Sequence, residues 1–300
     1  MTDPASVTGP VLTDLPPLHT RALVGWVSEE EAIRYVLGRP PLPTDDLSAI
    51  QQLVTDARAS VAGRPKVVVE DPVVSGDRSM FDSIAARPEV QASFAGLSWS
   101  IEWVGLSKVL PIQKFIKLDR LDSRVAAAAA DLDSLVELCL PSKGPADSVG
   151  MIADTDGHGL TVSSLNPNLR VTNMLFGDLV VSDRSGQQLG AGLGAAFMMG
   201  AGFGHMNVAR YQGRYLLRDG THRAAGLLRQ GVTIVPAVVV DAPSYEFVAT
   251  VPGLFPYDVM FGDRPPYLAD FWDNNVAADG LEPPARRVGR FRAEELLIPR

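Results

Sequence analysis

One stretch of this 300-residue chain, Asn207–Asp241, constrains the fold more than any other. It begins with two short segments of strand-forming residues, 208–211 and 214–217, separated by Gln212-Gly213. Two such segments joined by a two-residue turn that ends in glycine predict a β-hairpin. The chain therefore contains at least one pair of antiparallel strands in this region.

The second half of the stretch predicts a helix and a third strand. Asp219-Gly220 interrupts the hairpin, and apolar residues then recur at helical spacing over 221–230, before Gly231. The apolar run 233–240 predicts a strand, and Pro236 within it suggests a sheet edge or a bulge because proline has no N–H to donate. A hairpin, a helix and a strand in this order indicate an α+β fold with a small mixed sheet.

The rest of the chain divides into regions with different patterns. Residues 1–96 are expected to form a mainly helical N-terminal region, residues 97–241 the α+β core, and residues 242–300 an irregular wrap rich in proline and aromatic residues. The clearest N-terminal helix starts after Ser28, with Glu31 as its capping-box partner. Further expected elements are helices over 46–61, 80–86 and 122–140. We also expect a strand followed by a turn or short extended piece over 97–112, short strands and turns over 159–181, and a last strand over 288–298.

The glycine-rich run Gly190–Gly204 lacks the G-x-G-x-x-G spacing of a dinucleotide-binding turn. One interpretation is that the glycines let the backbone approach a ligand closely. We expect instead a close-packed or mobile loop, which is the more common role of such a run.

Composition narrows the classes of function. The net charge of −8 argues against a protein that holds nucleic acid through its overall field. The single cysteine, Cys139, lies in an apolar run and is expected to be a small buried hydrophobic residue. No segment has the pattern of a signal peptide or the length of a membrane span, so a cytoplasmic protein without membrane contact is expected.

The break at Asp219 has the chemistry of an anion site. A helix that starts near Gly220 presents N–H groups without internal partners, together with the positive end of the helix dipole. Gly220 leaves room for a ligand, His222 and Arg223 add donors, and Arg223 can bind two oxygen atoms of a phosphate. Asp219 can cap the helix, hold Arg223 or bind a metal ion carried by the phosphate. The alternative is an ordinary capped helix whose first turn faces solvent.

The residues Tyr215–Ala225, followed by Gly231 and by Val235–Val240, resemble the core of the ParB/sulfiredoxin superfamily, over a match that ends near Asp241. In that superfamily a strand leads into a Gly-x-(His or Arg)-Arg turn, a helix, a glycine and a strand that contains proline. Its members include partition proteins that bind CTP, sulfiredoxins that use ATP and free-serine kinases.

The resemblance implies that Gly220, Thr221, His222 and Arg223 contact the phosphates of a nucleotide or another phosphorylated small molecule, with Mg²⁺ as a companion ion. Phosphoryl transfer is the enzymatic version, of kinase or nucleotidase type, with Asp219, His222 or Glu102 as the catalytic candidates. No metal site built from the protein's own residues is expected.

Two other hypotheses stay open. The first is a DNA-associated regulator like the partition proteins, although the segment after Asp241 shows no helix pair that would read DNA and nucleic acid is not the expected partner. The second is a non-catalytic binding or scaffolding protein that retains the fold. Thr221 stands where sulfiredoxins carry a reactive cysteine, so reduction of a sulfinic acid is not expected. The sequence does not specify an oligomeric state.

Overall fold

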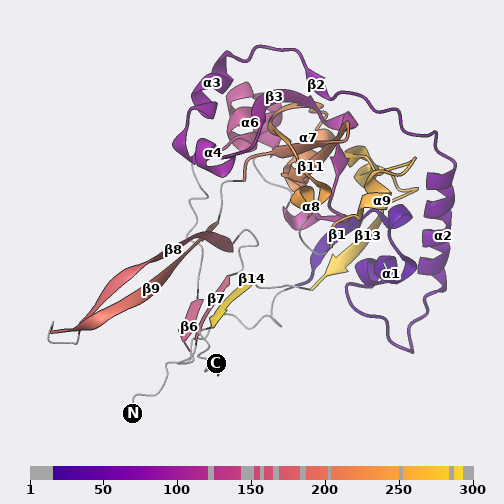
Figure 1. Cartoon of the computed structure of the whole chain (residues 1–300). Coiled ribbons are helices and arrows are strands. Elements are labelled where there is room, and N and C mark those ends of the chain that lie inside the picture. Colours follow the sequence, from indigo (N-terminus) through magenta and orange to yellow (C-terminus); the bar gives the residue numbers. More distant parts are fainter. Residues whose placement is uncertain are drawn as a thin grey trace. The chain divides into compact units, whose positions relative to one another are not determined.

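The computed structural model describes residues 16–120, 125–142, 152–155, 159–164, 169–182, 187–201, 204–249, 253–283 and 287–292. These residues form a mixed α/β structure, as expected, in two compact units. The larger unit combines Pro16–Ser142 with Gly204–Pro283 and holds every helix of the described residues (Figure 1). The smaller unit consists of β-strands within the part of the chain that is described.

A six-stranded mixed sheet lies at the centre of the larger unit, in the order β2-β3-β12-β10-β11-β4. Its strands are β2 (Val73–Val74), β3 (Trp99–Gly105), β4 (Leu110–Pro111), β10 (Asn207–Tyr211), β11 (Arg214–Asp219) and β12 (Ile234–Asp241). β10 runs parallel to β12 and β11 runs parallel to β4, whereas the other neighbours are antiparallel. The small mixed sheet expected from the sequence is therefore present.

The hairpin of β10 and β11 turns where the sequence predicts. Gln212 and Gly213 both have positive φ, 47° and 77°, as a two-residue turn of the primed type requires. The turn places Tyr211 opposite Arg214 and sets the register of the two strands.

The prediction that Pro236 marks a sheet edge or a bulge is wrong, because β12 lies between β3 and β10. The N–H of Val238 donates to the carbonyl oxygen of Met206 at 2.9 Å, on the β10 side of β12. Residues two apart in a strand direct their N–H groups to the same side. The backbone nitrogen of Pro236 therefore faces a position before the start of β10 at Asn207. No strand of the described residues pairs with β12 at that position on this side, so the proline costs the sheet no hydrogen bond.

A second sheet joins distant parts of the chain. It is antiparallel, in the order β13-β1-β5, and its strands are β1 (Leu18–Ala22), β5 (Phe115–Lys117) and β13 (Ala278–Glu282). Helix α1 (Glu29–Leu37) contacts β13. Its Ser28 cap, with Glu31 as the capping-box partner, confirms the predicted start, and the helix ends at Gly38, which has a φ of 70°.

The remaining helices of the described residues are short except for α2. They are η2 (Val24–Trp26), α2 (Ser48–Ala62), α3 (Ser79–Ala85), α4 (Pro88–Ser93), η3 (Leu106–Lys108), η4 (Leu118–Arg120), α5 (Val125–Ala130), α6 (Leu132–Cys139), α7 (Thr221–Arg229), α8 (Tyr245–Val248), α9 (Tyr257–Met260) and η5 (Leu268–Trp272). The single helix expected over 122–140 is wrong. Asp131 is extended, with φ −143° and ψ 132°, and its carboxylate accepts the N–H of Ser134, so it starts α6 as a new helix.

The smaller unit contains an antiparallel sheet and a long hairpin. The sheet has the order β14-β7-β6, and the hairpin pairs β8 with β9. The bounds are β6 (Ile152–Thr155), β7 (Gly159–Ser164), β8 (Leu169–Ser182), β9 (Gln188–Ala201) and β14 (Arg287–Arg292). The expected loop over 190–204 is wrong for residues 190–201, because these lie in β9 and pair with β8. Strands pair through backbone hydrogen bonds, which do not need side chains. In this hairpin two glycines, Gly194 and Gly177, lie directly opposite each other. The last strand, expected to reach residue 298, is described only up to Arg292.

One cluster of buried apolar side chains holds the larger unit together. It includes Ala22 and Ile116 from the three-stranded sheet and Val208 and Val238 from the six-stranded sheet. All three regions distinguished in the sequence contribute residues to this cluster. The division at residues 96/97 and 241/242 stays a prediction.

The close packing of β13 against α1 gives a test of this architecture. A Cβ atom on Gly280 would overlap the carbonyl oxygen of Tyr35. We expect Gly280→Ala to lower the free energy of unfolding by roughly 1–3 kcal/mol, because overpacking forces the backbone to shift. Chemical denaturation measures the effect.

The matched control is Gly63→Ala. A Cβ atom there would meet its nearest neighbour, the carbonyl oxygen of Ala59, at an ordinary 3.6 Å. We expect the control to keep or slightly raise the stability, by about 0.4–1 kcal/mol. Equal stabilities for both variants would contradict the packing of β13 on α1.

Candidate functional site

The segment Asp219–Arg223 forms the strand-to-helix turn that the sequence predicts. β11 ends at Asp219, Gly220 adopts the left-handed conformation with φ 93° and ψ 13°, and α7 starts at Thr221. Only glycine adopts such a φ at little cost. Gly220 is therefore the residue that allows the chain to leave the sheet and begin a helix at once.

The start of α7 has no side-chain cap. The Oδ1 atom of Asp219 accepts the N–H of Gly220 at 2.7 Å, one residue before the helix. Asp219 thus neither caps α7 nor binds Arg223, which were two of its expected roles. The first N–H groups of α7 are left facing the turn, with the positive end of the helix dipole behind them.

The guanidinium group of Arg223 connects the turn to another helix. Its Nη1 atom donates to the carbonyl oxygen of Leu138 at 2.8 Å, near the C-terminus of α6, where carbonyl groups lack intrahelical partners. Its Nη2 atom lies 3.3 Å from the positions that Cβ atoms would occupy on Gly204 and on Gly220. Two glycines therefore make room for this one cation beside the start of α7.

Two polar side-chain atoms are buried beside the turn without a hydrogen-bond partner in the described part of the chain. They are Oγ1 of Thr221, in a residue 1% exposed, and Oδ1 of Asn207, in a residue 5% exposed. Asn207 lies opposite Asp219 in the register of β10 and β11. A buried polar group without a partner costs about 1–3 kcal/mol. Such groups are typical of sites that a polar ligand completes.

Sequence reasoning identified Thr221 but missed Asn207. The signal was available, because Asn207 directly precedes the first strand of the predicted hairpin and must lie near the end of the second. The hairpin register alone, however, does not say that the amide is buried.

His205 and Cys139 lie near Arg223 in the interior. Burial lowers the pKa of His205, and the neighbouring cations Arg223 and Arg87 lower it further, against the opposing charges of Asp219 and Glu89. Burial raises the pKa of Cys139 to about 12. The cysteine is fully buried, which confirms the expected small hydrophobic residue and makes it a poor nucleophile.

Of the three catalytic candidates, Asp219 and His222 lie at the turn, and Glu102 does not. Glu102 is on β3, three strands from β11 in the sheet order, which corresponds to roughly 14 Å at about 4.8 Å per strand. Its carboxylate pairs with Arg78 at 3.0 Å. Glu102 therefore cannot contact a group held at Gly220 without a long ligand between them.

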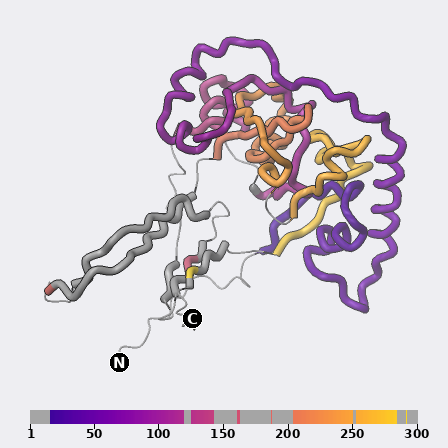
Figure 2. The backbone as a smooth tube through the Cα atoms, in the orientation of Figure 1, coloured from indigo at the N-terminus to yellow at the C-terminus, as the bar shows by residue number. Residues whose placement is uncertain are grey.

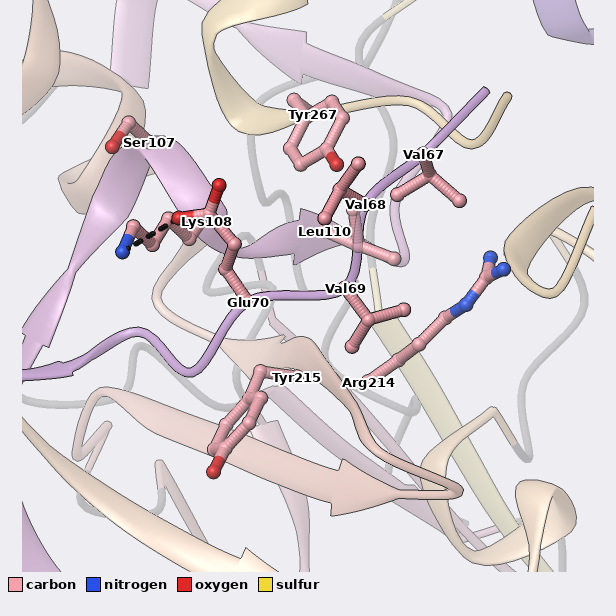
Figure 3. A pocket seen from close by; sticks show the side chains of 10 residues that line it. All are labelled: Val67, Val68, Val69, Glu70, Ser107, Lys108, Leu110, Arg214, Tyr215 and Tyr267. Carbon is pink, nitrogen blue, oxygen red and sulfur yellow. Dashed lines mark ion pairs between the residues drawn. The ribbon is translucent and has the colours of Figure 1, made fainter. Parts of the chain in front are cut away.

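Two cavities of the larger unit lie away from the turn. One, of about 320 Å³, is lined by residues that include Leu110, Tyr215 and Tyr267 (Figure 3). The other, of about 300 Å³, is lined by residues that include Glu102 and Asp241. Neither cavity includes a residue of the segment 219–223 among its lining.

Among the described residues, no group of three or more His, Cys, Asp and Glu side chains is placed to hold a metal ion. Likewise, none of the helices in the described ranges has the length and apolar character needed to cross a membrane. Comparison of the chain with protein-family models, curated proteins and solved structures found no match.

The buried histidine predicts a pH dependence of stability. The pKa of His205 is lower in the folded protein than its ordinary value of 6.5. As the pH falls below about 6.5, the unfolded chain therefore takes up a proton before the folded protein does. We expect the free energy of unfolding to decrease between pH 6.5 and the folded pKa.

The measurement is denaturant unfolding of the wild type and of His205→Gln over this pH range. The variant should lose the part of the pH dependence that the histidine causes. The same slope in both proteins would show that His205 is not buried in its neutral form.

Proposed function

We propose that the protein binds the phosphate group of a nucleotide or of another phosphorylated small molecule at Gly220–Arg223. The observation that carries the proposal is the pair of buried, unpartnered oxygen atoms, on Thr221 and Asn207, beside an uncapped helix N-terminus. A phosphate oxygen can accept a hydrogen bond from the Thr221 hydroxyl, and a hydroxyl group elsewhere on the ligand, such as that of a ribose, can donate to Oδ1 of Asn207. Such a ligand would therefore satisfy groups that destabilise the ligand-free fold.

The geometry at the turn suits an anion. The N–H groups of the first turn of α7 and the helix dipole favour negative charge. The Nη2 atom of Arg223 adds a charged donor beside Gly220, since only Nη1 is engaged by Leu138. A charge-assisted hydrogen bond of this kind contributes about 1.5–3 kcal/mol.

The resemblance to the ParB/sulfiredoxin superfamily supports a nucleotide as the ligand. The strand, the Gly-x-His-Arg turn, the helix and the proline-containing strand occur in this order in the structure. Phosphoryl transfer is the enzymatic form of the proposal, in which Asp219 or His222 would accept a proton and Mg²⁺ would accompany the phosphates. Glu102 is not placed for that role.

Substitution of Thr221 tests whether its hydroxyl contacts the ligand or has only a structural role. Valine has nearly the shape of threonine and lacks the hydroxyl. We expect Thr221→Val to raise the stability of the ligand-free protein by about 1 kcal/mol, because it removes a buried polar group without a partner. The same variant should bind phosphate ligands several-fold more weakly.

The test is a thermal-shift and calorimetric screen of inorganic phosphate, pyrophosphate and nucleotides with Mg²⁺, with duplex DNA as a comparison. Thr233→Val is a control, since Thr233 is exposed and distant from the turn in the chain. Equal affinities for wild type and Thr221→Val would remove the hydroxyl from the site. Binding of DNA alone, with no response to any phosphate ligand, would overturn the proposed function.

A further inference from the structure

The chain between α2 and β2 crosses the outside of the larger unit in an extended course (Figures 1 and 2). Its residues Pro65–Pro72 belong to no helix and to no paired strand. We call Lys66–Glu70 the valine strap, because Val67, Val68 and Val69 form its centre. Val68 is 74% exposed and Val69 is 52% exposed, which is unusual for residues that favour paired strands.

The valine strap is held at both ends. Before it, Arg64 binds Asp270 and Asp273 at 2.9 Å each. After it, the carbonyl oxygen of Pro72 accepts the N–H of Gly105 at 2.7 Å, where β2 joins the sheet. The fold therefore holds the strap in an extended conformation. A partner strand could pair with the strap without first ordering it.

One edge of the strap's backbone is open. The N–H of Val67 donates to the carbonyl oxygen of Asp263 at 2.7 Å, and no other backbone group of the strap has a hydrogen bond to a described residue. Backbone groups alternate in direction along an extended chain. The N–H and C=O groups of Lys66, Val68 and Glu70 therefore point away from Asp263.

Space is available next to the strap. The cavity of about 320 Å³ is lined by Val67, Val68 and Val69, with Tyr267 and Tyr215 on either side of the strap in Figure 3. The valine strap therefore borders unfilled space in the larger unit.

We infer that the valine strap pairs antiparallel with the valine strap of a second copy of this chain, about a two-fold axis at Val68. In this register Val68 lies opposite the partner's Val68, and Lys66 lies opposite the partner's Glu70. Lys66, Val68 and Glu70 are the residues with open backbone groups, so all three positions form hydrogen-bonded pairs.

Charge complementarity selects a second copy as the occupant. Lys66 and Glu70 stand at equal distances from Val68 and carry opposite charges, so a two-fold axis brings each against the other. Pro65 and Pro72 flank the strap, and proline ends a ladder of strand hydrogen bonds. The pairing is thereby limited to one short segment in one register, which prevents open-ended association.

The charged groups can exchange partners at little cost. Lys66 pairs with Asp263 at 2.8 Å, with side chains 72% and 61% exposed. Glu70 pairs with Lys108 at 2.8 Å, with side chains 55% and 44% exposed. Ion pairs this exposed add little to stability, so the dimer loses little when Lys66 and Glu70 turn toward the second copy.

The test is sedimentation equilibrium of the whole chain from low micromolar to near-millimolar concentration. We expect a monomer–dimer equilibrium. Lys66→Glu and Glu70→Lys should each weaken self-association about tenfold, since each creates two pairs of like charges across the two-fold axis of the dimer. Val68→Pro, which removes the central donor from both copies, should abolish dimerisation. Melting curves should show that all three variants stay folded.

Mixing the two charge variants gives the decisive control. The chain with Lys66→Glu carries two carboxylates on its strap, and the chain with Glu70→Lys carries two ammonium groups. An equal mixture should form heterodimers at least as well as the wild type self-associates. A wild type that is monomeric at every concentration, or single variants that dimerise like the wild type, would overturn the inference.

Discussion

The parallel pairing of β10 with β12 is the constraint on which the candidate site depends. β11 returns on one side of β10, and the chain must then reach the other side of β10 and run in the same direction as β10. α7 makes this connection, and it starts directly after β11 because Gly220 accepts a left-handed conformation. The sheet topology thus fixes the N-terminus of a helix at the end of a strand, which is the arrangement that an anion site requires.

In the proposed function, the residues around this helix have both structural and ligand-binding roles. Arg223 fastens the C-terminus of α6 through Leu138 while its second nitrogen atom faces the turn. Thr221 and Asn207 are buried with unpartnered oxygen atoms, an arrangement that lowers stability unless a ligand is bound. Such groups lower the stability of the ligand-free protein and raise its affinity for a ligand that satisfies them. Binding of that ligand should therefore raise the free energy of unfolding.

Most of the correct predictions came from local sequence patterns. The hairpin turn at Gln212-Gly213, the capping box at Ser28 and the strand-to-helix turn at Gly220 all depend on a few neighbouring residues with special backbone preferences. The missed strand and the missed site contacts have a different origin. Gly190 and its neighbours carry no side-chain pattern, so only the pairing with β8 reveals a strand. The burial of Asn207, the contact of Arg223 with Leu138 and the distance of Glu102 all follow from the assembled sheet, which sequence spacing does not encode.

The central claim is that the first N–H groups of α7 bind a phosphate, and an NMR titration tests it most directly. Backbone amide shifts of the ¹⁵N-labelled protein would be followed as inorganic phosphate, and then the best nucleotide from the ligand screen, is added. The account predicts that the amides of Thr221, His222 and Arg223 shift most, and downfield, because they donate to an anion. Saturable shifts that are centred on another part of the chain, with these three amides unchanged, would contradict it.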